Sequence, residues 1–190
     1  MKREVNKIIT NKAITWMIAT GLLATFGGAV SAQRGRQSGS LSALDKDYLK
    51  ASAQSNLEEV QFESVVLTHA ANGQDKEFGK RMRQDHARAN AELKAVAART
   101  GFQPPKDVSE DQKHIMERLA QFHGAAFDAA YKQEMVRDHT GDIAETQREM
   151  SLGKNPQVIA LAQKNLALLR MHLKMSQALP SGSEKTAAGT

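Results

Sequence analysis

The composition of this 190-residue chain excludes several classes of protein. The chain has no cysteine, which excludes a disulfide framework, a thiol nucleophile and a lipid-linked cysteine. Its net charge is +5, but the first 32 residues contain four basic residues and one acidic residue. The rest of the chain therefore carries 22 basic and 20 acidic residues, a net charge of +2. Because the basic residues are mixed with acidic ones and only 5% of the residues are aromatic, the composition argues against nucleic-acid binding.

Residues 1–32 have the three parts of an export signal. A basic segment precedes an apolar stretch over residues 13–30, which ends in the cleavage-site sequence Val30-Ser31-Ala32. The stretch is about long enough to span a bilayer, so a retained anchor is the alternative, but its three glycines and small-residue end favour cleavage. We expect a periplasmic or otherwise exported protein, with outer-membrane association left open. We expect it to contact the membrane only peripherally or through an uncleaved signal.

Composition divides the rest of the chain into a linker, one domain and a tail. Residues 33–44, which begin with QRGRQSGS, predict a flexible linker, and the polar residues 180–190 predict a disordered tail. Residues 45–179 are enough for one domain with a buried core. Ala, Leu, Gln, Glu, Lys and Met are plentiful in this domain, and these residues favour helix over sheet.

Turn residues predict two long helices in the first half of the domain. The first helix is expected from about residue 45 to 71, with Asn72-Gly73 as a favourable C-terminal pair. The second helix is expected from about residue 75 to 100, where Gly101 ends it.

The second half of the domain predicts one short helix and two long ones. The short helix is expected to begin with the capping-box sequence at residues 109–112 and to reach about residue 122. The third long helix is expected over residues 124–151. The fourth is expected from Asn155-Pro156, an N-cap followed by proline at the first helical position, to residue 179.

Each long helix carries apolar residues at steps of three and four. One-sided stripes on helices joined by short loops predict antiparallel packing. The predicted fold class is therefore all-α: an antiparallel four-helix bundle with a short extra helix between helices two and three. The stripes are Leu49, Ala53, Leu57, Val60 and Leu67; Phe78, Met82, Ala89, Leu93, Val96 and Ala97; Phe127, Tyr131, Met135, Ile143 and Met150; and Val158, Leu161, Ala162, Leu166, Leu169 and Leu173.

An eleven-residue pattern, M-x-x-D-H-x-x-x-x-A-E, occurs twice in the domain. It places one Asp-His pair at Asp85-His86 and a second at Asp138-His139, 53 residues further along the chain. Each histidine lies four residues after a stripe methionine, so both side chains should point toward the core. The repeat fits a bundle built from two related pairs of helices.

These histidines, with two further side chains, predict a metal site. His172 lies four residues after Leu168 and Glu59 lies at the border of the buried face, so each long helix brings one ligand inward. Imidazole and carboxylate together suit a transition metal such as Zn, Fe, Mn or Cu. The predicted ligands are Glu59, His86, His139 and His172.

Asp85 and Asp138 are not expected to bind the same ion as their histidine neighbours. Adjacent residues point about 100° apart around a helix, and no Glu-x-x-His spacing occurs at any of the three histidines. We expect each aspartate instead to bond a ring N–H or an arginine of the next helix. The more ordinary interpretation, without metal, is a buried polar clamp that fixes helix register.

Three sequence runs in the domain match those of a known family. They are D-H-x-x-x-N-A-E-L at residues 85–93, F-D-x-x-Y at residues 127–131, and the second Asp-His pair, Asp138-His139. With the segments around them, they resemble the exported bacterial family labelled domain of unknown function 4142 over nearly all of residues 45–179. The resemblance implies a ferritin-like four-helix bundle in the periplasm or outer membrane, and it implies no established activity.

Two functions follow from these observations. The first, which the sequence favours, is a non-enzymatic envelope protein that needs no cofactor and binds an unknown envelope protein or small ligand, for example in stress tolerance. The sequence has no Gly-x-Ser-x-Gly elbow, no G-x-G-x-x-G motif and no phosphate-loop lysine motif. The second is a metal-binding or metal-oxidising bundle. Rings more than about 8 Å apart could not share one ion, because metal–nitrogen bonds are about 2 Å long.

Overall fold

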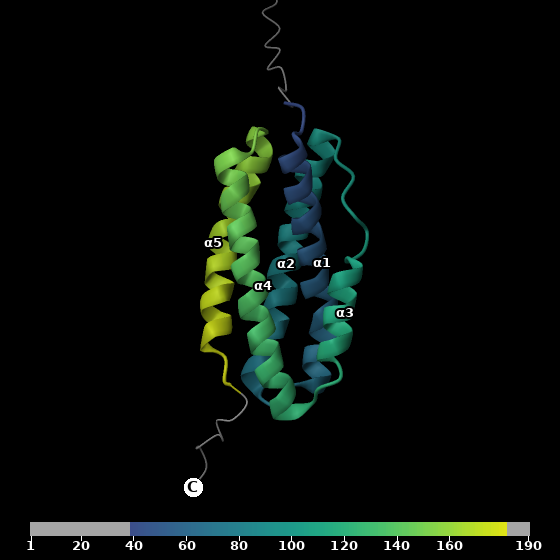
Figure 1. Ribbon diagram of the computed structural model, residues 1–190, viewed down its shortest axis with the longest axis vertical. Helices are drawn as coiled ribbons and strands as arrows, with labels where there is room; N and C mark the ends of the chain where they lie inside the picture. The colour runs from purple at the N-terminus through teal and green to yellow at the C-terminus, as the bar shows by residue number, and fades with distance from the viewer. Residues whose placement is uncertain (1–38, 182–190) are drawn as a thin grey trace, which may run out of the picture. The chain divides into compact units, whose positions relative to one another are not determined.

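The computed structural model describes residues 39–181 of the chain, which contain five helices and no strand (Figure 1). The predicted all-α class is confirmed. The expected signal, most of the expected linker and nearly all of the expected tail lie outside the described residues. No helix among the described residues is long and apolar enough to cross a membrane. The helices are α1 (Ala43–His69), α2 (Gly73–Thr100), α3 (Glu110–Leu119), α4 (Gly124–Leu152) and α5 (Pro156–Ala178).

The four long helices pack as two pairs. α1 packs along α2, and α4 packs along α5; α1 also contacts α4, and α2 contacts α5. The short helix α3 contacts α4 and lies outside the group of long helices in Figure 1. The described residues therefore form a helical bundle in which side chains from all four long helices can meet in the interior.

Helix capping moves two of the predicted helix boundaries. α1 begins two residues earlier than expected because Ser42 and Asp45 form a capping box, with Ser42 N donating to Asp45 Oδ2 at 2.6 Å. The prediction that Asn72-Gly73 ends the first helix is wrong. Asn72 Oδ1 accepts a hydrogen bond from Asp75 N at 2.8 Å, so Asn72 is the N-cap of α2, and α1 ends at His69.

The apolar core consists of two separate clusters. One contains residues from the second half of α1 and the first halves of α2 and α4, among them Phe62, Phe78 and Tyr131. The other contains residues from the first halves of α1 and α5 and the second half of α2, among them Leu49 and Leu93. On every long helix, the residues between these two clusters include buried polar side chains. The interior of the bundle therefore has a polar layer between two apolar ones.

This polar layer explains where the predicted stripes differ from the buried faces. All six predicted residues of α2 are buried, whereas Leu57, Val60 and Leu67 of α1 are only partly buried. Asn56 and Glu59 take the buried positions at the middle of α1. Ile143, Met150 and Leu173, on the other two long helices, are also only partly buried.

Candidate metal centre

Three histidines from three helices meet in the polar layer. His86 of α2, His139 of α4 and His172 of α5 are 2%, 0% and 0% exposed. Their ring centroids are 5.7 Å apart for His86 and His139, 5.1 Å for His86 and His172, and 5.4 Å for His139 and His172. One ring nitrogen from each histidine lies within 4.8 Å of one from each of the others. These separations are well inside the limit for sharing one ion.

Each of these rings uses one nitrogen to bond a group that accepts hydrogen bonds. His86 Nδ1 is 2.9 Å from Asn56 Oδ1, His139 Nδ1 is 2.9 Å from the Met135 carbonyl oxygen, and His172 Nε2 is 3.0 Å from Asp85 Oδ2. An amide oxygen, a carbonyl oxygen and a carboxylate only accept, so the bonded ring nitrogen carries the hydrogen in each case. In a neutral imidazole, the other nitrogen then has a free lone pair.

The second nitrogen of each ring has no hydrogen-bond partner. His86 Nε2, His139 Nε2 and His172 Nδ1 are all buried, and no described group donates to them. A buried acceptor without a partner costs roughly 1–3 kcal/mol. Three such nitrogens in one small volume are therefore unfavourable unless something binds them.

The surroundings of the three rings keep them neutral. Burial, followed by the neighbouring His139 and His172, lowers the pKa of His86 well below its usual value. Burial also lowers the pKa of His139 to about 4 and lowers that of His172, although Asp85 opposes the change at His172. Neutral imidazole is the form that binds metal ions.

Asp85 is fixed between its own helix and α5. Its carboxylate accepts hydrogen bonds from Arg81 and Arg88 of α2 as well as from His172. Burial would raise the pKa of Asp85, but these three hydrogen bonds outweigh it and lower the pKa to about 2. Asp85 therefore stays charged and holds His172 in one orientation, which matches the arrangement expected for an aspartate beside a ligand on the next helix.

The other two predicted site residues, Glu59 and Asp138, lie close to His139 but not to all three histidines. Glu59 is 3% exposed, and one ligand atom each from Glu59, Asp138 and His139 lie within 4.8 Å of one another. The structure does not bring Glu59 within this distance of all three histidines. Asp138 Oδ2 is 3.9 Å from His139 Nδ1, too far for a hydrogen bond.

Sequence reasoning missed the acidic residues around Glu59. Glu58 and Glu134 are 8% and 7% exposed, and Asp142 is partly buried and accepts a 2.6 Å hydrogen bond from Ser55 Oγ. Burial first, and then neighbouring carboxyl groups, raise the pKa of Glu58 to about 7 and that of Glu59 well above its usual value. The spacing Glu134, Asp138, Asp142 is a signal that could have revealed them, because residues four apart share one helix face.

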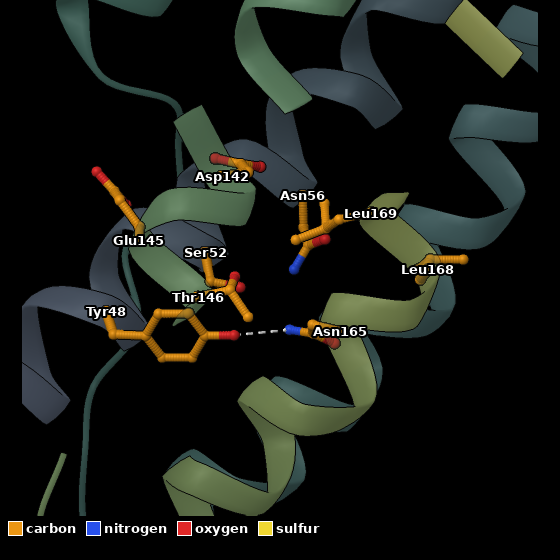
Figure 2. A pocket seen from close by; sticks show the side chains of 9 residues that line it. All are labelled: Tyr48, Ser52, Asn56, Asp142, Glu145, Thr146, Asn165, Leu168 and Leu169. Atoms are coloured by element: carbon orange, nitrogen blue, oxygen red, sulfur yellow. Dashed lines mark hydrogen bonds between the residues drawn. The ribbon is translucent and has the colours of Figure 1, made fainter. Parts of the chain in front are cut away.

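Asn56, also missed, connects the histidines to a small polar cavity. Its Oδ1 accepts from His86, while its buried Nδ2 has no partner. Asn56 lines a cavity of about 20 Å³, which is room for about one water molecule. Figure 2 shows this cavity between α1, α4 and α5, with Asn165 donating to the Tyr48 hydroxyl across it at 3.1 Å.

Comparison with known proteins identifies the family of this chain. No curated protein and no solved structure matches the chain. One family model matches residues 30–179, which include all five helices and the three histidines. By this match the chain belongs to the family described as Domain of unknown function (DUF4142).

Proposed function

We propose that this protein binds one transition-metal ion on His86, His139 and His172. The observation that carries the proposal is the set of three buried ring nitrogens without partners. A polar clamp would use the nitrogens that are already bonded, but it gives no role to the other three. A metal ion supplies one partner to all of them at once.

The chemistry of the ligands favours particular ions. Three neutral imidazoles suit Zn²⁺ and Cu²⁺ better than Mn²⁺ or Mg²⁺, which prefer oxygen ligands. In a tetrahedral zinc site with bonds of about 2.0–2.1 Å, ligand nitrogens are roughly 3.3 Å apart. Each ring has a nitrogen within 4.8 Å of one from each of the other two rings, so the three side chains have to move closer together to bind one ion.

The remaining parts of the proposal concern fold type and location. We propose an antiparallel four-helix bundle of the ferritin type, because four long helices each contribute inward side chains to one interior layer. We also propose that the protein works in the bacterial periplasm, peripherally at the outer membrane or free of it. The export signal expected over residues 1–32 supports this location.

Zinc titration of the purified full chain tests the metal proposal. After removal of metal with a chelator, isothermal titration calorimetry should show one Zn²⁺ per chain. The variant His172→Ala should bind at least 100-fold more weakly, because one of three ligands is lost while Asp85 and the other rings remain. The matched control is His114→Ala, since His114 is an exposed histidine of α3 outside the group. Absence of saturable zinc binding, or equal affinity in the two variants, would contradict the proposal.

A further inference from the structure

A second group of ligand atoms lies beside the three histidines, between α1 and α4. α1 contributes Glu58 and Glu59, and α4 contributes Glu134, Asp138 and Asp142. Three of these carboxyl groups belong to residues that are less than 9% exposed, and the side chain of Asp138 is 22% exposed. The three-histidine site proposed above uses none of them.

The arginines near this acidic group pair with a carboxylate at its edge. Arg137 bonds Glu134 on its own helix, and Arg118 of α3 lies 3.8 Å from the same carboxylate. Both arginines have side chains more than 60% exposed. Among the described residues, no lysine or arginine nitrogen forms an ion pair within 4.0 Å of a carboxylate oxygen of Glu59 or Asp138, since Arg118 and Arg137 both pair with Glu134. Buried carboxylates without a nearby charge partner are strongly unfavourable unless they bind a cation or a proton.

The surroundings of the Glu59 carboxyl group indicate that it binds a ligand. Its side chain is nearly completely buried, and no described residue donates a hydrogen bond to it. Burial first, and then four neighbouring carboxyl groups, raise the pKa of Glu59 well above its usual value. Its oxygens nevertheless come within 4.8 Å of one Asp138 oxygen and of one His139 ring nitrogen. Two oxygens from facing helices at this separation can approach a single ion without a backbone movement.

We propose that Glu59 and Asp138 bind a second divalent cation, of the hard, oxygen-preferring class to which Mn²⁺ belongs. His139 does not serve as its ligand, because Nδ1 donates to the Met135 carbonyl oxygen and Nε2 belongs to the three-histidine site. Mg²⁺, a member of this class, keeps several water ligands and is usually bound through one or two carboxylates rather than by a complete cage of protein ligands. Glu58, Glu134 and Asp142 surround the site and add negative charge. In excluding His139 as a ligand, this proposal rests on the three-histidine site proposed above.

Manganese binding separates this site from the histidine site. The full chain is first saturated with Zn²⁺, and Mn²⁺ alone is then titrated while the electron paramagnetic resonance signal of free Mn²⁺ is followed. The zinc-loaded protein should remove one equivalent of free Mn²⁺. Glu59→Gln should weaken Mn²⁺ binding at least 10-fold and leave zinc stoichiometry at its original value. The matched control is Glu117→Gln, a change at an exposed glutamate of α3, which should bind both ions normally.

The outcomes distinguish the two proposals. Normal zinc binding without saturable Mn²⁺ binding would overturn the second site and leave the first intact. Equal Mn²⁺ affinity in Glu59→Gln and Glu117→Gln would overturn it as well. If Glu59→Gln does not fold, as judged by circular dichroism, Asp138→Asn provides the same test from α4. Conversely, His172→Ala should lose zinc but keep Mn²⁺, and loss of both ions would contradict two separate sites.

Discussion

His86, His139 and His172 differ in what holds each ring. A side-chain amide, a backbone carbonyl and a carboxylate each accept one N–H, and together they fix which nitrogen of each ring is free. Groups that orient a ligating histidine typically change metal affinity 10–100-fold when they are removed. Of the three, Asn56 offers the cleanest test, because it is a side chain that makes no ion pair with its surroundings.

Asn56→Ala should weaken zinc binding about 10–100-fold, because His86 loses the acceptor that fixes its tautomer. Asn56→Asp keeps an oxygen acceptor and should retain most of the affinity. The matched control is Asn90→Ala, a change at another buried asparagine of the bundle that does not bond a histidine. Calorimetric titration measures all three variants. If alanine and aspartate at position 56 bind zinc equally well, Asn56 does not position His86.

At the residue scale, the sequence predicted the inward histidines and a bond from Asp85 to a group of another helix, but not the partners of His86 and His139. The spacing of four residues from Met82 and Met135 is a property of the helix itself, so it was visible in the sequence. His86 bonds Asn56 and His172 bonds Asp85, and in both cases the partner lies on a neighbouring helix. Such bonds depend on tertiary packing, which the spacing of residues within one helix does not show. For the same reason, the sequence could not show that Glu59 lies with Asp138 rather than with all three histidines.

At the scale of helices, a glycine in the middle of α4 and the glycine that caps its C-terminal end have opposite surroundings. Gly141 is exposed in the middle of α4, and a Cβ added there would have no atom within 4 Å. Gly153 caps the end of α4, and a Cβ there would lie 2.5 Å from the Glu149 carbonyl oxygen. Any residue can adopt the φ of −56° found at Gly153, so backbone conformation does not require glycine there. The lack of room for a side chain beside Glu149 does.

Gly141→Ala should raise the free energy of unfolding by about 0.5–1 kcal/mol, because alanine favours helix and meets no obstacle. Gly153→Ala should lower it by about 1–3 kcal/mol, because the helix end must shift to avoid the Glu149 carbonyl. Urea denaturation of the two variants beside the unchanged chain measures both effects. Stabilisation by both substitutions would mean that the turn between α4 and α5 is less tightly packed than described.

Element boundaries were predictable where a local signal acts alone. The capping box at residues 109–112 starts α3, and Asn155-Pro156 starts α5, as expected. Asn72-Gly73 was misread because the same two residues suit either the end of one helix or the start of the next. The hydrogen bond from Asp75 N to Asn72 Oδ1 shows that Asn72 caps the start of α2. Asp128 of α4, which accepts from Asn72 N, joins this turn to the other helical pair.

At the scale of the whole molecule, buried carboxyl pairs hold the ends of the bundle. Asp45 accepts hydrogen bonds from the backbone N–H groups of Lys154 and Asn155, and Glu149 lies beside it, completely buried. Burial, and then Asp45, raise the pKa of Glu149 from 4.5 to about 7. Burial likewise raises the pKa of Asp75, beside Asp128, from 3.8 to about 7.

These raised pKa values make stability depend on pH. A carboxyl group whose pKa is higher in the folded state stabilises the fold below its unfolded pKa, and this contribution is lost as pH rises through the folded value. The contribution of Glu149 to the free energy of unfolding of the metal-free chain should therefore fall between pH 5.5 and pH 8, by on the order of 1–3 kcal/mol. The lowered pKa values of the three histidines act in the opposite direction over this range, so the contribution of Glu149 is measured by comparing variants.

Urea denaturation at pH 5.5 and pH 8 measures this fall. Glu149→Gln should reduce it, because glutamine does not titrate, whereas the exposed-site variant Glu117→Gln should leave it unchanged. An equal change in the free energy of unfolding between pH 5.5 and pH 8 in both variants would contradict the role given to Glu149.

The central claim is that three histidine side chains share one metal ion inside the bundle. X-ray absorption spectroscopy at the zinc edge, on the full chain loaded with one equivalent of Zn²⁺, tests it most directly. The expected spectrum shows three imidazole rings bound through nitrogen at about 2.0–2.1 Å. A spectrum of zinc bound only to oxygen, or to a single imidazole, would contradict the claim.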